Sequence, residues 1–165
     1  MIAAPSRMWA AVAFTDIVGS TRLAASLGDS AWRRLLDRHD AVVREACGRF
    51  DGRVWKWTGD GALMTFPSPR HALSSARALH AGAARLGVTL RIGINVGEVD
   101  VRGADICGLV VNIASRLTSA AAPGRVLLSR DAAAFLGRED SYAAVTGQQT
   151  SVVCASRSSG SPVGR

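Results

Sequence analysis

The chain has 165 residues, the length of one domain that can bury a single hydrophobic core without disulfides or structural metals. Apolar residues make up 48% of the sequence and charged residues 20%, a composition that excludes disordered and fibrous proteins. No apolar run approaches the ~18 residues of a membrane helix, and residues 1–11 lack the features of a signal peptide. The sequence therefore predicts a cytoplasmic protein without a membrane partner.

The formal net charge of +7 would suit a nucleic-acid partner, but the basic residues are spread along the chain without a dense run. Such a distribution indicates solvated helix faces, so no nucleic-acid partner is predicted. The three cysteines, Cys47, Cys107 and Cys154, are scattered and lack C-x-x-C spacing. They predict reduced, mostly buried thiols and neither a disulfide framework nor a zinc site.

The first half of the chain predicts a strand, a helical stretch broken near Gly28, a β-hairpin and a further helix. These elements cover residues 9–15, 21–50, 53–66 and 70–86. The hairpin has the sequence Gly59-Asp60-Gly61 at its tip, which is a turn signal.

The second half predicts a strand that turns at Gly97 into a second short strand, then a loop, a helix, a strand and a short helix. These elements cover residues 89–96, 98–101, 102–108, 110–120, 126–129 and 131–136. Beyond residue 137, only residues 151–155 resemble a strand. The order predicts an α+β fold of ferredoxin-like or palm type, with helices packed on one face of a sheet that contains antiparallel strands.

Two carboxylates stand where predicted strands end. Asp16 follows the first strand, and Asp60 lies at the hairpin tip; neither has a basic neighbour in the sequence. Two carboxylates brought together would repel each other unless cations lay between them, and Mg²⁺ prefers one or two carboxylates together with phosphate oxygens. The spacing alone leaves two interpretations open, a metal site or a helix cap and a turn residue.

Four segments around and beyond these carboxylates form recognisable motifs. They are Phe14-Thr15-Asp16-Ile17-Val18-Gly19-Ser20-Thr21, Lys56-Trp57-Thr58-Gly59-Asp60-Gly61, Leu90-Arg91-Ile92-Gly93-Ile94 and Asp105-Ile106-Cys107-Gly108 continuing to Arg116. These motifs resemble, in the same order, those of the catalytic domain of bacterial class III adenylate and guanylate cyclases, and the resemblance extends over residues 9–136. The resemblance implies a class III cyclase domain over residues 9–155, preceded by an extension over residues 1–8 and followed by a disordered tail over residues 156–165.

The resemblance also implies roles for individual residues. Asp16, Asp60 and the backbone carbonyl of Ile17 fall on the positions that bind two divalent ions, Mg²⁺ or Mn²⁺. Lys56, the single lysine of the chain, and Asp105 fall on the positions that select the purine. A lysine can donate to adenine N1 and an aspartate can accept from the N6 amino group, so this pair predicts ATP.

Two residues of the predicted helix over 110–120 complete the implied site. Asn112 and Arg116 are four residues apart, so they share a helix face. By resemblance, Asn112 orients the ribose, and Arg116 stabilises charge on the α-phosphate while the 3′-hydroxyl attacks and pyrophosphate leaves. The family pattern further implies a homodimer in which each site takes its metal ligands from one subunit and its other residues from the second.

The sequence departs from the family at two positions. Cys107 replaces an aromatic residue near the purine-selecting aspartate, and Thr146 stands where a lysine usually holds the triphosphate. Arg125, Arg130 and Arg138 remain candidates to replace that lysine. The main hypothesis is therefore an active adenylate cyclase, and the alternative is a degenerate domain that binds nucleotide or pairs with another cyclase chain.

Overall fold

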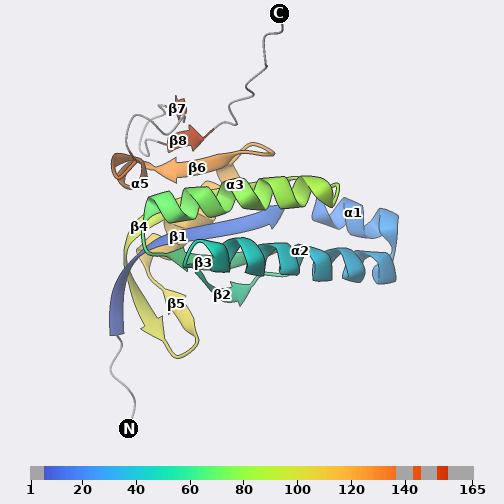
Figure 1. The fold of residues 1–165 in the computed structure, drawn as a ribbon, viewed down its shortest axis with the longest axis horizontal. Coiled ribbons are helices and arrows are strands. Elements are labelled where there is room, and N and C mark those ends of the chain that lie inside the picture. The colour runs from blue at the N-terminus through green and yellow to red at the C-terminus, as the bar shows by residue number, and fades with distance from the viewer. Residues whose placement is uncertain (1–5, 137–142, 146–151, 156–165) are drawn as a thin grey trace, which may run out of the picture.

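The computed structural model describes residues 6–136, 143–145 and 152–155, and its strands form one mixed sheet (Figure 1). The strands are β1 (Ser6–Ile17), β2 (Arg53–Trp57), β3 (Gly61–Phe66), β4 (Leu90–Arg102), β5 (Asp105–Cys107), β6 (Val126–Ser129), β7 (Ala143–Val145) and β8 (Val152–Ala155). The helices are α1 (Ser20–Leu27), α2 (Asp29–Arg49), α3 (Pro69–Arg85), α4 (Leu109–Ala120) and α5 (Arg130–Ala134). The sheet order is β2-β3-β1-β4-β6-β8-β7, and β5 pairs with β4 beside this path.

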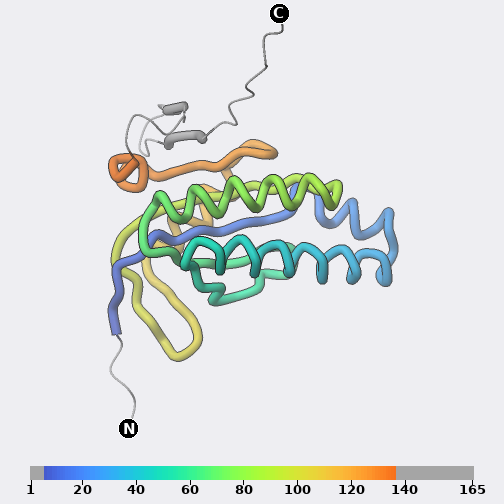
Figure 2. The backbone as a smooth tube through the Cα atoms, in the orientation of Figure 1, coloured from blue at the N-terminus to red at the C-terminus, as the bar shows by residue number. Residues whose placement is uncertain are grey.

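The centre of the sheet is the antiparallel pairing of β1 with β4, which lie side by side along the middle of the molecule (Figure 2). Every residue from Ser6 to Ile17 has a partner in β4. On the outer side of β1 lies β3, again antiparallel, and on the outer side of β4 lies β6, which runs parallel to it. β1 begins at Ser6, so residues 6–8, which we expected to belong to an N-terminal extension, are part of the sheet.

The two faces of the sheet carry different helices. Side chains alternate along a strand, so neighbouring residues of β1 face opposite ways. Ala11 and Ala13 belong to the larger core cluster, which contains the buried residues of α2 and α3, whereas Val12 belongs to a second cluster with Val111 and Ala114 of α4. The predicted packing on one face therefore holds for α2 and α3 but not for α4.

Most predicted helices and strands agree with the structure within a few residues, including the break at Gly28 and the hairpin of β2 and β3. Two predictions between residues 97 and 108 are wrong. Gly97 is not a turn, because it pairs with Ala10 inside the continuous strand β4. The expected loop over 102–108 contains β5, which folds back on β4 through a tight turn. The position of Thr146 and the tail 156–165 lie outside the described residues.

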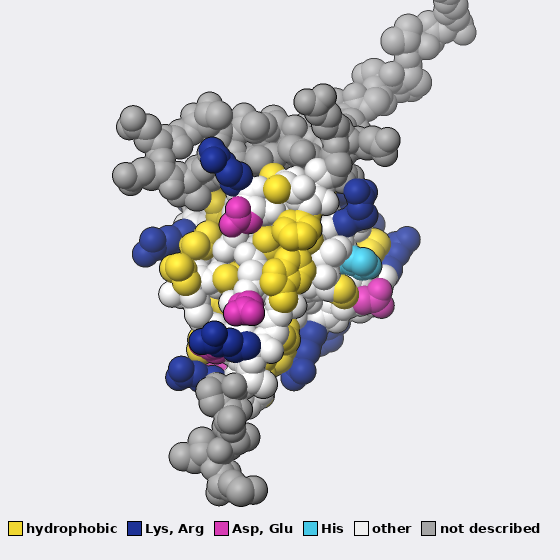
Figure 3. Space-filling model, turned by 90° about the vertical axis from the view of Figure 1, so that its left-hand side faces the viewer, with side chains coloured by type: hydrophobic (Ala, Val, Ile, Leu, Met, Phe, Trp, Pro, Cys, Tyr) yellow, Lys and Arg dark blue, Asp and Glu magenta, His cyan; other side chains and the backbone are white. Residues whose placement is uncertain are grey.

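One side of the molecule, where β1 begins and α5 lies, carries exposed aromatic residues. The rings of Trp9 and Phe135 pack against each other at a tilt of 56° with their centroids 5.3 Å apart, and the residues are 45% and 59% exposed. Figure 3 shows this side, with apolar side chains at its centre and charged side chains around them. Among the described residues, no helix has the length and apolar character that a bilayer span requires.

The close packing of α4 on the sheet depends on Gly93 of β4. A Cβ atom at Gly93 would collide with the backbone of Ala114 and Thr118 in α4, so the helix and the strand can approach only because this residue has no side chain. The hydroxyl of Thr118 also donates a 3.2 Å hydrogen bond to the carbonyl of Phe14 in β1. These contacts hold α4 close to the two central strands.

We expect Gly93→Ala to lower the free energy of unfolding by about 1–3 kcal/mol, because α4 must move away from β4. The measurement is urea denaturation followed by circular dichroism. The matched control is Gly48→Ala in α2, where the space around the new methyl group is open. That substitution should raise stability by up to about 1 kcal/mol. Equal stability of Gly93→Ala and the unmodified protein would contradict this account of the packing.

Candidate active site

The structure places Asp16 and Asp60 on neighbouring segments at one end of the sheet. Asp16 is not beyond the first strand, as predicted, but inside it, opposite Gly61 of β3. The backbone N–H of Ile17 donates a 3.2 Å hydrogen bond to the carbonyl of Asp60. This backbone contact joins the two carboxylate-bearing segments, which are far apart in the sequence.

The hairpin tip can lie against β1 because of Gly61. A Cβ atom there would collide with the carbonyl group of Thr15, so the close approach requires glycine. The backbone N–H of Ala62 also donates to the Thr15 hydroxyl at 3.2 Å. The glycines beside Asp60, predicted to serve a turn, therefore include one that brings the tip against the strand that holds Asp16.

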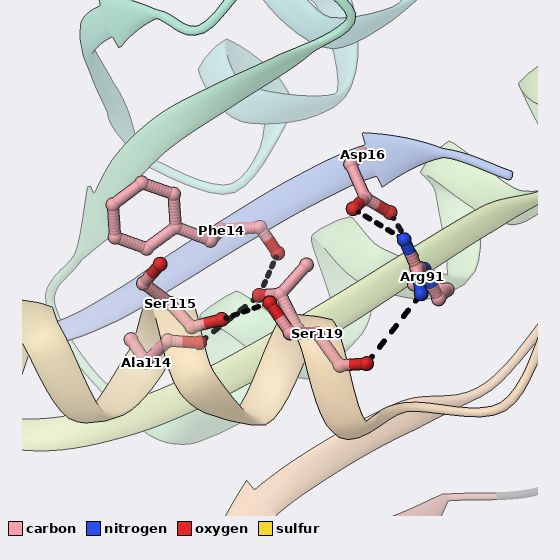
Figure 4. A network of polar contacts seen from close by, with 7 residues as sticks. Phe14, Asp16, Arg91, Ala114, Ser115 and Ser119 are labelled. Atoms are coloured by element: carbon pink, nitrogen blue, oxygen red, sulfur yellow. Dashed lines mark hydrogen bonds and ion pairs between the residues drawn. The ribbon is translucent and has the colours of Figure 1, made fainter. Parts of the chain in front are cut away.

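An arginine that the sequence did not indicate as part of the site binds Asp16 (Figure 4). The Arg91 Nε donates to one carboxylate oxygen at 3.0 Å, and its Nη2 donates to the other at 2.9 Å. The pKa of Arg91 is raised, mainly by these hydrogen bonds and also by the charges of Asp16 and Asp60. The strand register could have revealed this partner, because Arg91 lies directly opposite Asp16.

The residues at this end of the sheet suit divalent cations. The available oxygens are the two carboxylates and the carbonyl of Ile17, and the Asp60 carboxylate makes no hydrogen bond or ion pair with the described residues. A positive group, the Arg91 guanidinium, already lies on Asp16 and within the field of Asp60. Two carboxylates and a backbone carbonyl form a small set of hard oxygen donors, the kind that Mg²⁺ takes together with substrate phosphates and water.

The two predicted purine-selecting residues lie in contact. The ammonium group of Lys56 donates to a carboxylate oxygen of Asp105 at 3.0 Å, and the side chains are 57% and 49% exposed. The backbone N–H of Ile106 donates to the other oxygen at 2.8 Å. The hydrogen bond from Lys56, followed by that from Ile106, lowers the pKa of Asp105. A donor and an acceptor thus stand side by side, open to solvent.

A β-bulge in β2 directs Lys56 toward Asp105. The pairing register of β2 with β3 shifts between Val54, opposite Met64, and Lys56, opposite Leu63. Cross-strand partners share a face, and Leu63 belongs to the cluster on the α4 side of the sheet. With regular alternation, Lys56 would lie on the same face as Val54, which packs against the cluster under α2 and α3.

The register of β5 fixes the positions of Asp105 and Cys107 relative to Lys56. Asp105 is opposite Arg102, and Cys107 is opposite Asp100, so the strand fixes which residue comes close to Lys56. Cys107 is partly buried and lies two residues along the same strand. The aspartate, and not the thiol, contacts the lysine.

Asn112 and Arg116 lie on the exposed side of α4. The opposite side of the helix, with Val111 and Ala114, is buried against the sheet. Neither Asn112 nor Arg116 has a side-chain hydrogen bond or ion pair within the described residues. One chain therefore brings together two separate groups, Asp16 with Asp60 and Lys56 with Asp105, while the two α4 side chains point outward without a partner.

Comparisons with known proteins identify a family for this arrangement. The family model of the adenylate and guanylate cyclase catalytic domain matches residues 3–158. The chain is 35% identical over 131 residues to the putative adenylate cyclase 3 of Rhizobium meliloti (strain 1021), a match that covers 74% of this chain and 22% of that protein. It is 32% identical over 145 residues to the adenylate cyclase of Glutamicibacter nicotianae, covering 87% of this chain and 36% of that one. The chain thus spans well under half the length of these relatives.

The fold is also found among solved structures. The crystal structure of the adenylyl cyclase CyaB from P. aeruginosa matches with a TM-score of 0.85 at 24% sequence identity, over 94% of this chain and 97% of that one. This likeness confirms the predicted α+β fold of the class III cyclases.

Proposed function

Because the chain belongs to the family of adenylate and guanylate cyclase catalytic domains, we propose that it converts ATP to 3′,5′-cyclic AMP and pyrophosphate. The observation that carries the choice of ATP is the contact between Lys56 and Asp105. Adenine presents an acceptor, N1, beside a donor, the N6 amino group. A lysine donor beside an aspartate acceptor complements this edge, whereas guanine presents the reverse pattern.

Asp16, Asp60 and the carbonyl of Ile17 would hold two divalent cations, Mg²⁺ or Mn²⁺. Such ions, when bound, lower the pKa of the ribose 3′-hydroxyl and neutralise charge on the leaving pyrophosphate. The chain keeps the carboxylate-bearing segments together through the backbone bond from Ile17 to Asp60. Arg91 adds a positive charge beside them, which is relevant because the family's triphosphate-binding lysine is replaced at Thr146.

Arg116 and Asn112 would act on the reacting end of the nucleotide. In an in-line attack of the 3′-hydroxyl on the α-phosphate, negative charge develops on the phosphoryl oxygens. The planar guanidinium of Arg116 can donate two hydrogen bonds to these oxygens, and the amide of Asn112 can hold the ribose. Both side chains are exposed on α4 and free to take these partners.

A homodimer with two shared sites would complete this machinery. In one chain, the side chains of Asn112 and Arg116 make no hydrogen bond or ion pair with Asp16 or Asp60. Exposed residues also follow Asp105 in the chain, since the 72% exposed Leu109 begins α4, and Asn112 and Arg116 lie on the exposed side of that helix. Pairing of two copies would cover these residues and place the α4 residues of one subunit over the carboxylates of the other.

The first test is the reaction itself. Purified protein incubated with ATP and Mn²⁺ or Mg²⁺ should form cyclic AMP, and Asp16→Ala should lower the rate by more than about a hundredfold. The control is Arg77→Ala, an exposed change on α3 remote from the site. No cyclic AMP above the Asp16→Ala level would overturn the enzyme assignment. Retained nucleotide binding would then favour the alternative, a degenerate domain that only binds nucleotide or pairs with another cyclase chain.

The second test concerns the base. The double variant Lys56→Glu with Asp105→Cys removes both contacts to adenine, so kcat/KM for ATP should fall by at least about a hundredfold. Arg77→Glu makes the same charge change as Lys56→Glu on an exposed residue of α3 and should leave ATP use within about twofold. An unchanged ATP rate in the double variant would contradict the assignment of Lys56 and Asp105.

The third test separates shared sites from sites within one chain. Asp60→Ala and Arg116→Ala proteins should be inactive alone, and an equal mixture should regain about a quarter of the activity, because half of the dimers are mixed and each has one intact site. A mixture of Asp16→Ala with Asp60→Ala should regain none, since both changes damage the metal-binding half. Lack of recovery in the first mixture, with subunit exchange verified by mass spectrometry, would count against shared sites.

A further inference from the structure

The ion pair of Arg91 with Asp16 is not an ordinary surface salt bridge. A second cross-strand pair, Arg7 with Asp100, lies at the opposite end of the same two strands and is likewise directly opposed in register. There, a single hydrogen bond of 3.1 Å joins the side chains, and Arg7 is 70% exposed. Arg91 instead uses two donors on Asp16 and is 32% exposed.

A third contact orients the Arg91 guanidinium. Its Nη1 donates to the backbone carbonyl of Ser119 near the end of α4 at 3.4 Å (Figure 4). The group is therefore tied to β1 on one side and to α4 on the other. Bidentate pairs of arginine with carboxylate are both stronger and more strictly oriented than single-contact pairs.

Both oxygens of Asp16 accept N–H donors in this arrangement, whereas the Asp60 carboxylate has no such partner among the described residues. The guanidinium fork takes one lone pair on each Asp16 oxygen and places a positive charge against the carboxylate, so a divalent cation that approaches Asp16 meets fewer open lone pairs and electrostatic repulsion. We propose that Arg91 is a built-in counter-ion that closes the metal site of the nucleotide-free chain, and that a cation enters only as the guanidinium leaves Asp16. This inference rests on the proposed function, which assigns Asp16 to the metal site.

Metal binding without nucleotide is then suppressed for two reasons. The apparent affinity is reduced by the fraction of molecules in which Asp16 is open. A cation that enters alone also leaves a displaced guanidinium within the same small volume, and the two positive charges repel each other. Metal occupancy is therefore expected to depend on an anion arriving in the site.

The test measures Mn²⁺ binding to the nucleotide-free protein by the electron paramagnetic resonance signal of free Mn²⁺. Arg91→Gln should bind Mn²⁺ about three- to tenfold more tightly than the unmodified protein. Arg91→Lys keeps the charge but loses the two-pronged contact, so it should also bind more tightly, by a smaller factor. Arg7→Gln, the matched control from the second cross-strand pair, should stay within about twofold. The proposal is overturned if both Arg91 variants bind Mn²⁺ with the same affinity as the unmodified protein. It is also overturned if only Arg91→Gln binds Mn²⁺ more tightly, because that result would indicate a simple charge effect.

Arginine side-chain NMR provides a readout that does not depend on activity or stability. Titration with Mg²⁺ should move the Nε–H resonance of Arg91 and leave that of Arg7 in place. A stationary Arg91 resonance at saturating Mg²⁺ would show that the guanidinium stays on Asp16, and would overturn the proposal.

Asp16→Asn distinguishes this proposal from the one on which it rests. If Asp16→Asn binds Mn²⁺ as tightly as the unmodified protein, the assignment of Asp16 to the metal site fails, and the counter-ion role fails with it. If Asp16→Asn weakens binding but neither Arg91 variant tightens it, the metal site stands and only the counter-ion role is lost.

Discussion

The antiparallel pairing of β1 with β4 extends over all of β1, and the other elements of the domain take their positions from it. Its register sets Asp16 opposite Arg91, while β3 on the other side of β1 sets the same residue opposite Gly61. A slip of two residues would keep every side chain on its own face of the sheet but would separate Asp16 from Arg91. The pairing that organises the fold therefore also fixes the charges of the candidate site.

The two faces of the sheet differ in what packs on them. One face packs against α2 and α3 and contains the larger core cluster, whereas the other carries α4 and the residues proposed to contact nucleotide. Gly93 allows α4 to lie close to β4, and the buried side of the helix turns Asn112 and Arg116 outward. Close packing of a helix on a sheet suits side chains that must stabilise charge, because little rearrangement is needed when a ligand binds.

Sequence reasoning predicted the elements whose signals are local. Helical periodicity and turn residues located α1 to α4, and the resemblance to the cyclases paired Lys56 with Asp105 across the intervening chain. Arg91 was missed because a cross-strand partner depends on register, which no local pattern encodes. Gly97 was misread as a turn because glycine favours turns, but it also fits where a helix crosses a strand. Periodicity showed which side of α4 is apolar, but not which face of the sheet it covers.

The bulge in β2 makes the proposed purine contact depend on the pairing register of the hairpin as well as on its residues. One extra residue between Val54 and Lys56 turns the lysine to the face that carries Asp105. Loss of the bulge without a change in length would pair Trp55 with Leu63 and turn Lys56 to the face covered by α2 and α3, whereas deletion of Trp55 would leave the lysine opposite Leu63. A homologous chain of equal length without the bulge could therefore lose the proposed purine contact while the lysine remains, and a chain one residue shorter could keep it, so aligned residue identities alone do not decide whether the contact can form.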